Sequence, residues 1–332
     1  MRRLLEALIV LFGAIAATCT VCSTLAGDVP QSRESYGTRL SQRAASALDA
    51  FTVKTLTSVS TSVHVQLEKN QTLHCLSFRG SGNGPPIVLL HGISSCAADY
   101  YPLIRCLQQY SRRIVAIDLP GHGQSVADPS MTVEQLDGFM ITSLTEACKT
   151  LGLNDDKFVL LGNSLGGFVA CKYASLHSSK LHSLILLSPA GAPLSEDELA
   201  QLKRLFSINT LGDAVKFLDS VLGNTNRLPW GLRQLVGWAC RERTRRPAVQ
   251  RILQEATLSN RLLESDVAII RCPILLVWGQ REAVFGAKQL DWFLGHLPSQ
   301  FLSVVRPREV GHVPHLDAAA VSESIVRFLE SL

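Results

Sequence analysis

The chain has 332 residues, of which 46% are hydrophobic and 18% are charged. A sequence of this length and hydrophobicity can bury a large core, which excludes an intrinsically disordered protein and favours one large domain with an insertion. The formal net charge is only +4 and no long basic run alternates with aromatic residues, so nucleic acid is not an expected partner.

The first 26 residues form a segment of their own. Two arginines at positions 2 and 3 precede a mainly apolar stretch from about residue 7 to residue 26. The small residues around Thr24-Leu25-Ala26 suit a signal-peptide cleavage site, but an apolar stretch of roughly 20 residues can also span a bilayer. We therefore expect either a signal peptide or a membrane anchor, and hence membrane association or the secretory route.

Residues 27–55 are predicted to be a polar linker, and residues 56–332 a folded domain. The domain begins with two stretches of alternating polarity, residues 58–68 and 72–80, which predict an antiparallel hairpin. Continuous apolar runs bounded by turns follow, and such runs are typical of strands buried on both faces of a parallel sheet. They occupy residues 85–92, 112–121, 157–164, 182–191, 272–279 and 299–305, with helix-like segments at 98–111, 132–152 and 319–332.

One interval interrupts this alternation. Between residues 191 and 272, about 80 residues contain no convincing strand pattern. Ser195 and Glu198 form a capping box, and apolar residues recur at helical spacing from Leu211 onward. We predict a helical cap at about residues 193–265, placed at the carboxyl end of the sheet, where ligands of open α/β sheets bind.

Cysteine and glycine patterns give no sign of a metal or a cofactor. The nine cysteines are irregularly spaced, and the seven beyond the N-terminal segment do not form a disulfide framework. Cys19 and Cys22 form a single C-x-x-C without a second pair, and the glycines of residues 80–84 lack the spacing of a dinucleotide-binding loop. We expect neither a cofactor nor a metal.

The stretch LLGNSLGGFV, residues 160–169, surrounds Ser164 with glycines. Glycine is used where the backbone needs a positive φ or where another group approaches closely. Gly162-x-Ser164-x-Gly166 therefore predicts a sharp strand-to-helix turn with the serine hydroxyl at its apex. Such a nucleophile needs a base, an acid that orients the base, and donors for the oxyanion.

The base and the acid are expected on loops that follow the last two strands. His312, in EVGHVPHLD, lies between the last predicted strand and the last helix, and it is preferred over His315 three residues later. Glu282 follows the strand PILLVWG and is the predicted acid, because no carboxylate directly follows residues 182–191. Other carboxylates rank below it: Asp266, Asp291 and Asp118, the last interpreted as a structural residue that bonds loop backbone.

Two backbone N–H groups are the predicted oxyanion donors. One belongs to Leu165, directly after the nucleophile, and the other to Ile93, which follows His91-Gly92. Gly92 allows the backbone to approach the substrate oxygen, and Ser94 beside it is expected to line the substrate-binding pocket.

Five motifs, PPIVLLHG, DLPGHGQS, GNSLGG, LLVWGQRE and VGHVPH, occur in the order and spacing seen in α/β-hydrolase fold proteins with a helical cap. The resemblance covers roughly residues 56–332. Within that fold, the sequence is most similar to membrane-associated monoacylglycerol lipases and related bacterial lipases and esterases. It implies an α/β-hydrolase fold and a serine esterase that acts on small-molecule or lipid esters, with Ser164, Glu282 and His312 in the triad order. A membrane surface is a possible partner. The family usually has Asp where this chain has Glu282.

Two alternatives stay open. The motif GNSLGG is also similar to that of carbon–carbon bond hydrolases, although HGISSCAADY lacks their Gly-Pro-Gly segment and GHVPH lacks the tryptophan near their histidine. A catalytically silent scaffold on the same fold is supported only by the exchange at Glu282. A basic cluster in the insertion either meets anionic lipid headgroups or forms a solvated helix face. It consists of Arg241, Arg243, Arg245, Arg246 and Arg251.

Overall fold

The computed structural model describes residues 60–67, 71–128, 131–153, 156–223 and 230–332. The predicted signal or anchor segment, residues 1–26, and the predicted linker, residues 27–55, lie outside the described residues. Within the described ranges, none of the helices combines the length and the apolar character needed to cross a bilayer.

The described strands form one eight-stranded sheet in the order β1-β2-β4-β3-β5-β6-β7-β8. β1 pairs antiparallel with β2, and β2 pairs antiparallel with β4, whereas the other neighbours are parallel. This arrangement confirms the predicted N-terminal hairpin and the parallel sheet. The strands are β1 (Thr61–Gln66), β2 (Thr72–Arg79), β3 (Ile87–Leu90), β4 (Arg113–Ile117), β5 (Phe158–Asn163), β6 (Leu181–Leu187), β7 (Ile274–Val277) and β8 (Leu302–Val305).

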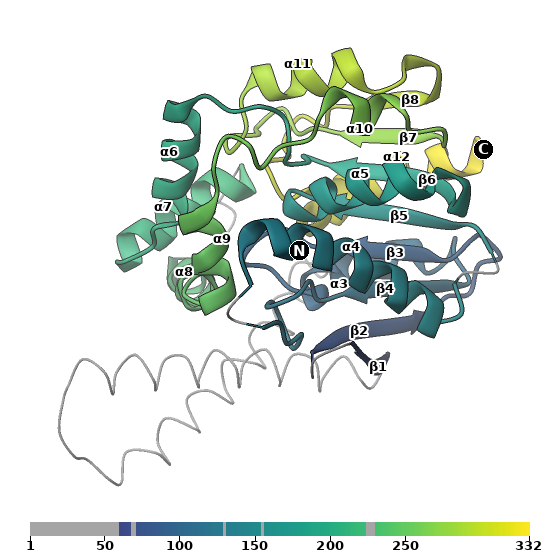
Figure 1. Cartoon of the computed structure of the whole chain (residues 1–332), viewed down its shortest axis with the longest axis horizontal. Helices are drawn as coiled ribbons and strands as arrows, with labels where there is room; N and C mark the ends of the chain where they lie inside the picture. The colour runs from purple at the N-terminus through teal and green to yellow at the C-terminus, as the bar shows by residue number, and fades with distance from the viewer. Residues whose placement is uncertain (1–59, 68–70, 129–130, 154–155, 224–229) are drawn as a thin grey trace, which may run out of the picture.

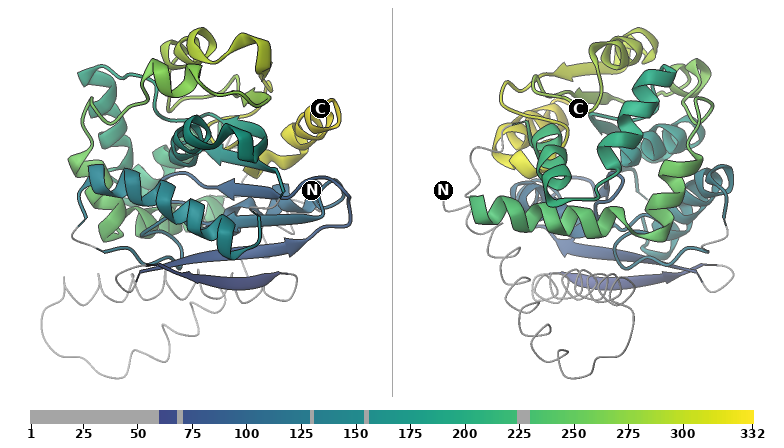
Figure 2. Two further views of the ribbon diagram at one scale, coloured as in Figure 1. Left: turned by 45° about the vertical axis from the view of Figure 1, so that its right-hand side comes forward. Right: turned by 90° about the vertical axis from the view of Figure 1, so that its left-hand side faces the viewer.

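Helices cover both faces of the sheet, and this explains the continuous apolar runs (Figure 2). Successive strand side chains point to opposite faces, so Leu160 joins the core under one helical layer and Leu161 the core under the other. The first layer comprises α4 (Val133–Thr150), α5 (Leu165–His177), α10 (Glu264–Ala268) and α11 (Ala287–His296). The second comprises α3 (Tyr101–Leu107) and α12 (Ala318–Glu330).

Four further helices follow β6 and precede β7 in the chain. They lie beside the carboxyl ends of the parallel strands (Figure 1). They are α6 (Glu196–Phe206), α7 (Leu211–Leu222), α8 (Trp230–Thr244) and α9 (Pro247–Glu255), and together we call them the cap. The capping box predicted at the start of α6 is present, because Ser195 Oγ accepts from the Glu198 N–H at 3.3 Å and Glu198 Oε2 accepts from the Ser195 N–H at 2.8 Å. The cap has its own small core, in which the rings of Phe206 and Phe217 meet edge to face at 5.1 Å.

Candidate active site

Ser164 lies alone between the last residue of β5 and the first residue of α5. Its φ of 52° and ψ of −117° lie outside the regions that non-glycine residues usually adopt, at a cost of about 1–3 kcal/mol. The flanking glycines make this turn possible. A Cβ atom on Gly162 would lie 2.2 Å from the Gly166 carbonyl oxygen, and one on Gly166 would lie 2.1 Å from the Leu90 carbonyl oxygen. The predicted strand-to-helix turn is therefore present, with the serine side chain at its apex.

His312 and Glu282 form a buried pair on the loops after β8 and β7. The His312 Nδ1 atom lies 2.9 Å from Glu282 Oε2, and both side chains are almost fully buried. The other carboxylate oxygen, Oε1, accepts hydrogen bonds from the backbone N–H groups of Val284 at 2.8 Å and Phe285 at 3.1 Å. Backbone N–H groups of its own loop therefore fix the carboxylate, and the carboxylate in turn orients the imidazole.

The electrostatics of this pair favour an ionised carboxylate. Burial alone would raise the pKa of Glu282, but the neighbouring His312 and the hydrogen bonds that the carboxylate accepts outweigh burial and hold the pKa below its usual value. An ionised carboxylate can only accept, so Nδ1 of His312 carries the proton. In the neutral imidazole, a proton on Nδ1 leaves Nε2 as the nitrogen that can accept a proton.

Asn163 ties the histidine loop to the nucleophile turn. Its Nδ2 donates to the main-chain carbonyl of His312 at 2.9 Å and to that of Leu187 at 2.9 Å. The residue before Ser164 is therefore bonded to the main chain of His312, 149 positions later. Sequence analysis did not single out Asn163, although a polar residue at the end of a fully apolar strand was a visible signal.

The two predicted oxyanion donors approach Ser164 from different elements. Leu165 is the first residue of α5, where backbone N–H groups have no intrahelical partner. The loop after β3 passes next to the serine, because a Cβ atom on Gly92 would lie 3.1 Å from the Ser164 Cβ atom. Ile93 lines the same pocket as Ser164 and Leu165, whereas Gly92 and Ser94 are not among the lining residues.

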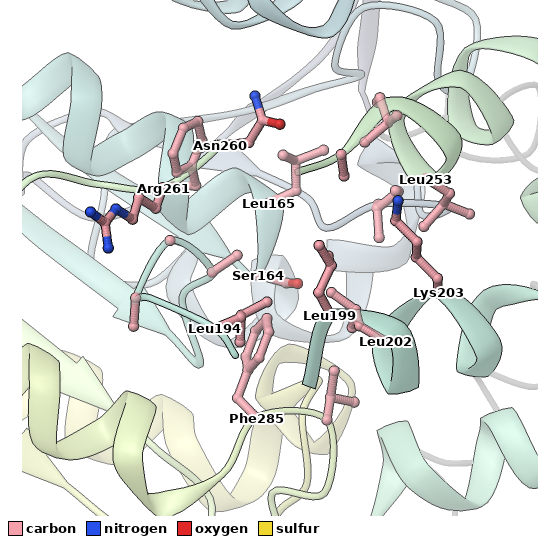
Figure 3. Close-up of a pocket in the computed structure, with 18 of the residues that line it drawn as sticks. Ser164, Leu165, Leu194, Leu199, Leu202, Lys203, Leu253, Asn260, Arg261 and Phe285 are labelled. Carbon is pink, nitrogen blue, oxygen red and sulfur yellow. The ribbon is translucent and has the colours of Figure 1, made fainter. Parts of the chain in front are cut away.

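An apolar pocket opens above Ser164 and is walled on one side by the cap (Figure 3). It encloses about 1060 Å³ of space, counting the part open to solvent. Apolar side chains from α6, α9 and the loops around the serine dominate its wall, and they include Leu194, Leu199, Leu202, Leu253 and Phe285. Lys203 and Arg261 lie on opposite sides of Ser164 in this view. The pocket is suited to an apolar chain that reaches the serine.

The lower-ranked residues have other partners. His315 is buried with its ring 4.4 Å from that of Tyr100, and burial lowers its pKa to about 4, so it stays neutral. Asp266 bonds Lys172 at 2.6 Å. Asp118 bonds loop backbone as expected, with Oδ1 accepting from the Ala97 N–H at 2.6 Å. The structure provides no interaction for Asp291 that would place it at the site.

A second Ser-His-Asp chain lies near the edge of the sheet. Ser62 Oγ is 3.0 Å from His74 Nε2, and His74 Nδ1 is 2.7 Å from Asp118 Oδ2. Ser62, however, lies within the extended strand β1 and does not line the pocket above Ser164. Asp118 also accepts from the Gln124 N–H at 2.9 Å. We interpret this chain as a brace for the loops around Asp118.

Three arginines of the predicted basic cluster attach the cap to the body. Arg243 pairs with Asp99 at 2.8 Å, Arg246 donates to the Gly123 carbonyl at 2.7 Å, and Arg251 donates to the Met131 carbonyl at 3.0 Å. These guanidinium groups are engaged within the protein, so a role at lipid headgroups stays a prediction that these contacts do not support.

The seven cysteines of the described ranges are all free thiols. Across the part of the chain that the structure describes, no group of three or more His, Cys, Asp or Glu side chains is arranged to hold a metal ion.

Several known proteins are similar to this chain in sequence or in fold. Monoacylglycerol lipase ABHD6 of Homo sapiens is 34% identical over 134 residues, which cover 40% of this chain and only 39% of the relative. Lipase 3 of Moraxella sp. (strain TA144) is 25% identical over 316 residues, which cover 93% of this chain and 91% of the relative. The crystal structure of a membrane phospholipase A, described as a bacterial virulence factor, shares the fold with a TM-score of 0.71 and 23% identity, over 100% of this chain and 99% of that one.

The family assignment rests on a match that covers most of the chain. Residues 85–319 match the model of the α/β hydrolase fold, and this range contains the nucleophile turn, the cap and both loops of the Glu282–His312 pair. The chain therefore belongs to the α/β hydrolase fold family.

Proposed function

We propose that the protein is a serine hydrolase that cleaves carboxylic esters of apolar acyl chains. One observation carries this proposal: Ser164, in a strained turn tied to the loop of the Glu282–His312 pair, lies at an apolar pocket together with Ile93 and Leu165. A nucleophile, a base with its orienting acid, and two donors are the parts that acyl transfer requires.

The reaction follows from the role of each group. His312 Nε2 takes the proton of the Ser164 hydroxyl as Oγ attacks the ester carbonyl, and the oxyanion accepts hydrogen bonds from the N–H groups of Leu165 and Ile93. The imidazolium, stabilised by Glu282, then protonates the departing alcohol, which leaves an acyl-enzyme. Water, deprotonated by His312, attacks the acyl carbon, and collapse of the second intermediate returns the proton to Ser164 and releases the acid.

We infer that the preferred substrates are lipid esters such as monoacylglycerols. The apolar pocket wall accommodates a hydrocarbon chain better than a polar acyl group, because burial of apolar surface stabilises the complex by roughly 25 cal/mol per Å². The printed names of two similar proteins, a monoacylglycerol lipase and a lipase, support the same substrate class.

The decisive experiment measures hydrolysis of p-nitrophenyl esters and monoacylglycerols of increasing chain length by the full chain. Ser164→Ala is expected to lower kcat by at least about a thousandfold. Ser62→Ala is the matched control, because it removes a serine that also faces a histidine, and it should keep full activity. A fluorophosphonate should label the parent and Ser62→Ala, but not Ser164→Ala.

Other outcomes would redirect the proposal. Turnover of a vinylogous diketone without turnover of esters would favour a carbon–carbon bond hydrolase. Neither turnover nor labelling of the parent would favour a catalytically silent scaffold.

We also propose that the N-terminal apolar stretch brings this activity to a membrane or into the secretory route. This proposal rests on the sequence pattern of residues 1–26 alone. Fractionation of cells that express the full chain, or the chain that begins at residue 27, measures the effect. Loss of the membrane or secreted fraction on truncation is expected, and an unchanged distribution would contradict it.

A further inference from the structure

Asp99 connects the cap to the loop that carries one oxyanion donor. It lies in the short 3₁₀ helix η2 (Ala97–Tyr100), just after residues 92–96, which we call the oxyanion loop. Its Oδ2 atom accepts from the Ser95 hydroxyl at 2.6 Å and from the Cys96 N–H at 3.3 Å. The same oxygen accepts from Nη1 of Arg243 at 2.8 Å, and Oδ1 lies 3.1 Å from that nitrogen.

The oxyanion loop needs such an anchor because its backbone is strained. Ser94 has a φ of 60°, in the left-handed region that non-glycine residues seldom adopt. The Ser95 N–H donates to the Gly92 carbonyl at 3.2 Å, so the turn that presents Ile93 ends at a residue bonded to Asp99. A strained turn persists only when its surroundings fix it.

The charge on Asp99 is compensated mainly by the cap. Burial would raise the pKa of Asp99, but Arg243 and the hydrogen bond from the Ser95 hydroxyl outweigh burial and hold the pKa below its usual value. The Arg243–Asp99 pair is largely buried, and α8 supplies the guanidinium. Removing one member of such a pair leaves an uncompensated charge, which costs far more than breaking an exposed pair.

The cap also supports the histidine loop. The backbone N–H groups of His312 and Val313 donate to the Val221 carbonyl in α7 at 2.9 Å and 3.3 Å. The cap is therefore hydrogen-bonded to the histidine loop directly and linked to the oxyanion loop through Asp99.

We propose that Asp99 is a positioning residue that fixes the conformation of the oxyanion loop. Through its ion pair with Asp99, Arg243 makes this conformation depend on the packing of the cap against the body. The Ile93 N–H then reaches its working position only when α8 lies on the body. This inference rests on the proposed function, since it assigns the Ile93 N–H to the oxyanion.

The test compares ester hydrolysis with binding of a trifluoromethyl ketone, whose adduct with Ser164 carries an oxyanion. Arg243→Ala and Asp99→Asn should lower kcat by about 10- to 100-fold and weaken ketone binding by the same factor. This is less than the roughly 100- to 1000-fold cost of deleting an oxyanion donor, because the Ile93 N–H is displaced and not removed. KM should change by less than about twofold, because the ground-state carbonyl uses these donors little. Arg243→Lys keeps the charge and should recover part of both losses.

The matched control is Arg251→Ala. It removes a second contact between the cap and the body, the 3.0 Å bond to the Met131 carbonyl, without touching Asp99. Ketone affinity should stay unchanged in this variant. The double variant of Asp99→Asn with Arg243→Ala should be no worse than the worse single variant, because both act through one pair.

Two results would overturn the inference. One is unchanged kcat and ketone affinity in both Arg243→Ala and Arg243→Lys, and the other is an equal loss in Arg251→Ala. If Arg243→Ala fails to fold, Arg243→Lys decides: activity and ketone affinity that fall together support the inference, and unchanged values refute it. A parent chain that neither cleaves esters nor binds the ketone would refute the proposed function itself, which is a distinct result.

Discussion

At the scale of single residues, Glu282, the proposed triad acid, bonds both His312 and its own loop. Oε2 reaches His312, while Oε1 accepts from the backbone N–H groups of Val284 and Phe285. These loop amides fix the carboxylate, so the extra methylene does not leave it free to rotate. The departure from the usual family residue therefore does not remove the orienting bond to the imidazole.

Two substitutions of Glu282 separate the effect of its charge from the effect of its side-chain length. Glu282→Gln keeps the shape but removes the charge and favours the wrong imidazole tautomer, so we expect kcat to fall by at least about a hundredfold. Glu282→Asp keeps the charge but must give up either His312 or the loop amides, so its loss should be smaller, about tenfold. Steady-state kinetics on one ester measures both, and a Gln variant as active as the parent would contradict the role of Glu282 as the acid.

At the scale of elements, close packing of α5 on the sheet depends on glycine. Gly166 lies in the first turn of α5, where any Cβ atom would meet the Leu90 carbonyl oxygen of β3 at 2.1 Å. A main-chain oxygen inside a sheet cannot move aside as the end of a flexible side chain can. Gly138 in α4 is the opposite case, because nothing lies within 4 Å of a Cβ atom there.

The two glycines therefore predict opposite effects of alanine. Gly166→Ala should destabilise the protein by more than about 2 kcal/mol, because the helix must shift away from β3. Gly138→Ala should stabilise it by about 0.5–1 kcal/mol, since alanine lowers the entropy of the unfolded chain and fits the helix. Denaturant unfolding measures both changes. Equal free energies of unfolding for the two variants would refute the argument from close packing.

At the scale of the whole molecule, the cap packs against the loops that carry the proposed catalytic residues. Its small core packs against partly buried side chains from three of these loops: Ile93, Val284 and Val313. The two larger cores lie on either side of the sheet and hold the strands whose ends carry the site. The cap therefore acts as a structural wall of the site.

The stability of the molecule should depend on pH through Asp137, a half-buried carboxylate of α4 at the pocket. Burial, and to a lesser extent Glu134, raise its pKa from 3.8 to about 6, despite the opposing effect of Lys172. The folded state then binds more protons than the unfolded state between these two pKa values, so stability falls as the pH rises through this window. Above it, the ionised Asp137 destabilises the fold by about 1–2 kcal/mol, after allowance for partial exposure.

Asp137→Asn removes this penalty. Thermal unfolding at about pH 4 and about pH 8 should show the variant gaining stability over the parent only at the higher pH. Glu134→Gln, on the exposed side of the same helix, is the control and should show no comparable gain. A constant difference between parent and Asp137→Asn at both pH values would contradict the raised pKa.

The sheet and its N-terminal hairpin could be predicted from local patterns in the sequence, and the same patterns singled out a helical interval and the candidate triad. Continuous apolar runs indicated strands that are buried on both faces, and β3 to β7 have that environment. Glycines at fixed offsets from Ser164 predicted a tight turn, and Glu282 and His312 were chosen as candidates because parallel strands end at one edge of the sheet. These features are local in the chain or follow from the topology of the fold.

Contacts between groups that lie far apart in the sequence could not be predicted from local patterns. Arg243 pairs with Asp99 across 144 positions, and Asn163 bonds the His312 carbonyl across 149 positions. Nothing in the local pattern around Arg243 distinguishes a guanidinium that faces solvent from one that reaches a buried carboxylate. That choice depends on how the cap packs on the body, which is set by the combined burial of many apolar side chains that lie far apart in the sequence.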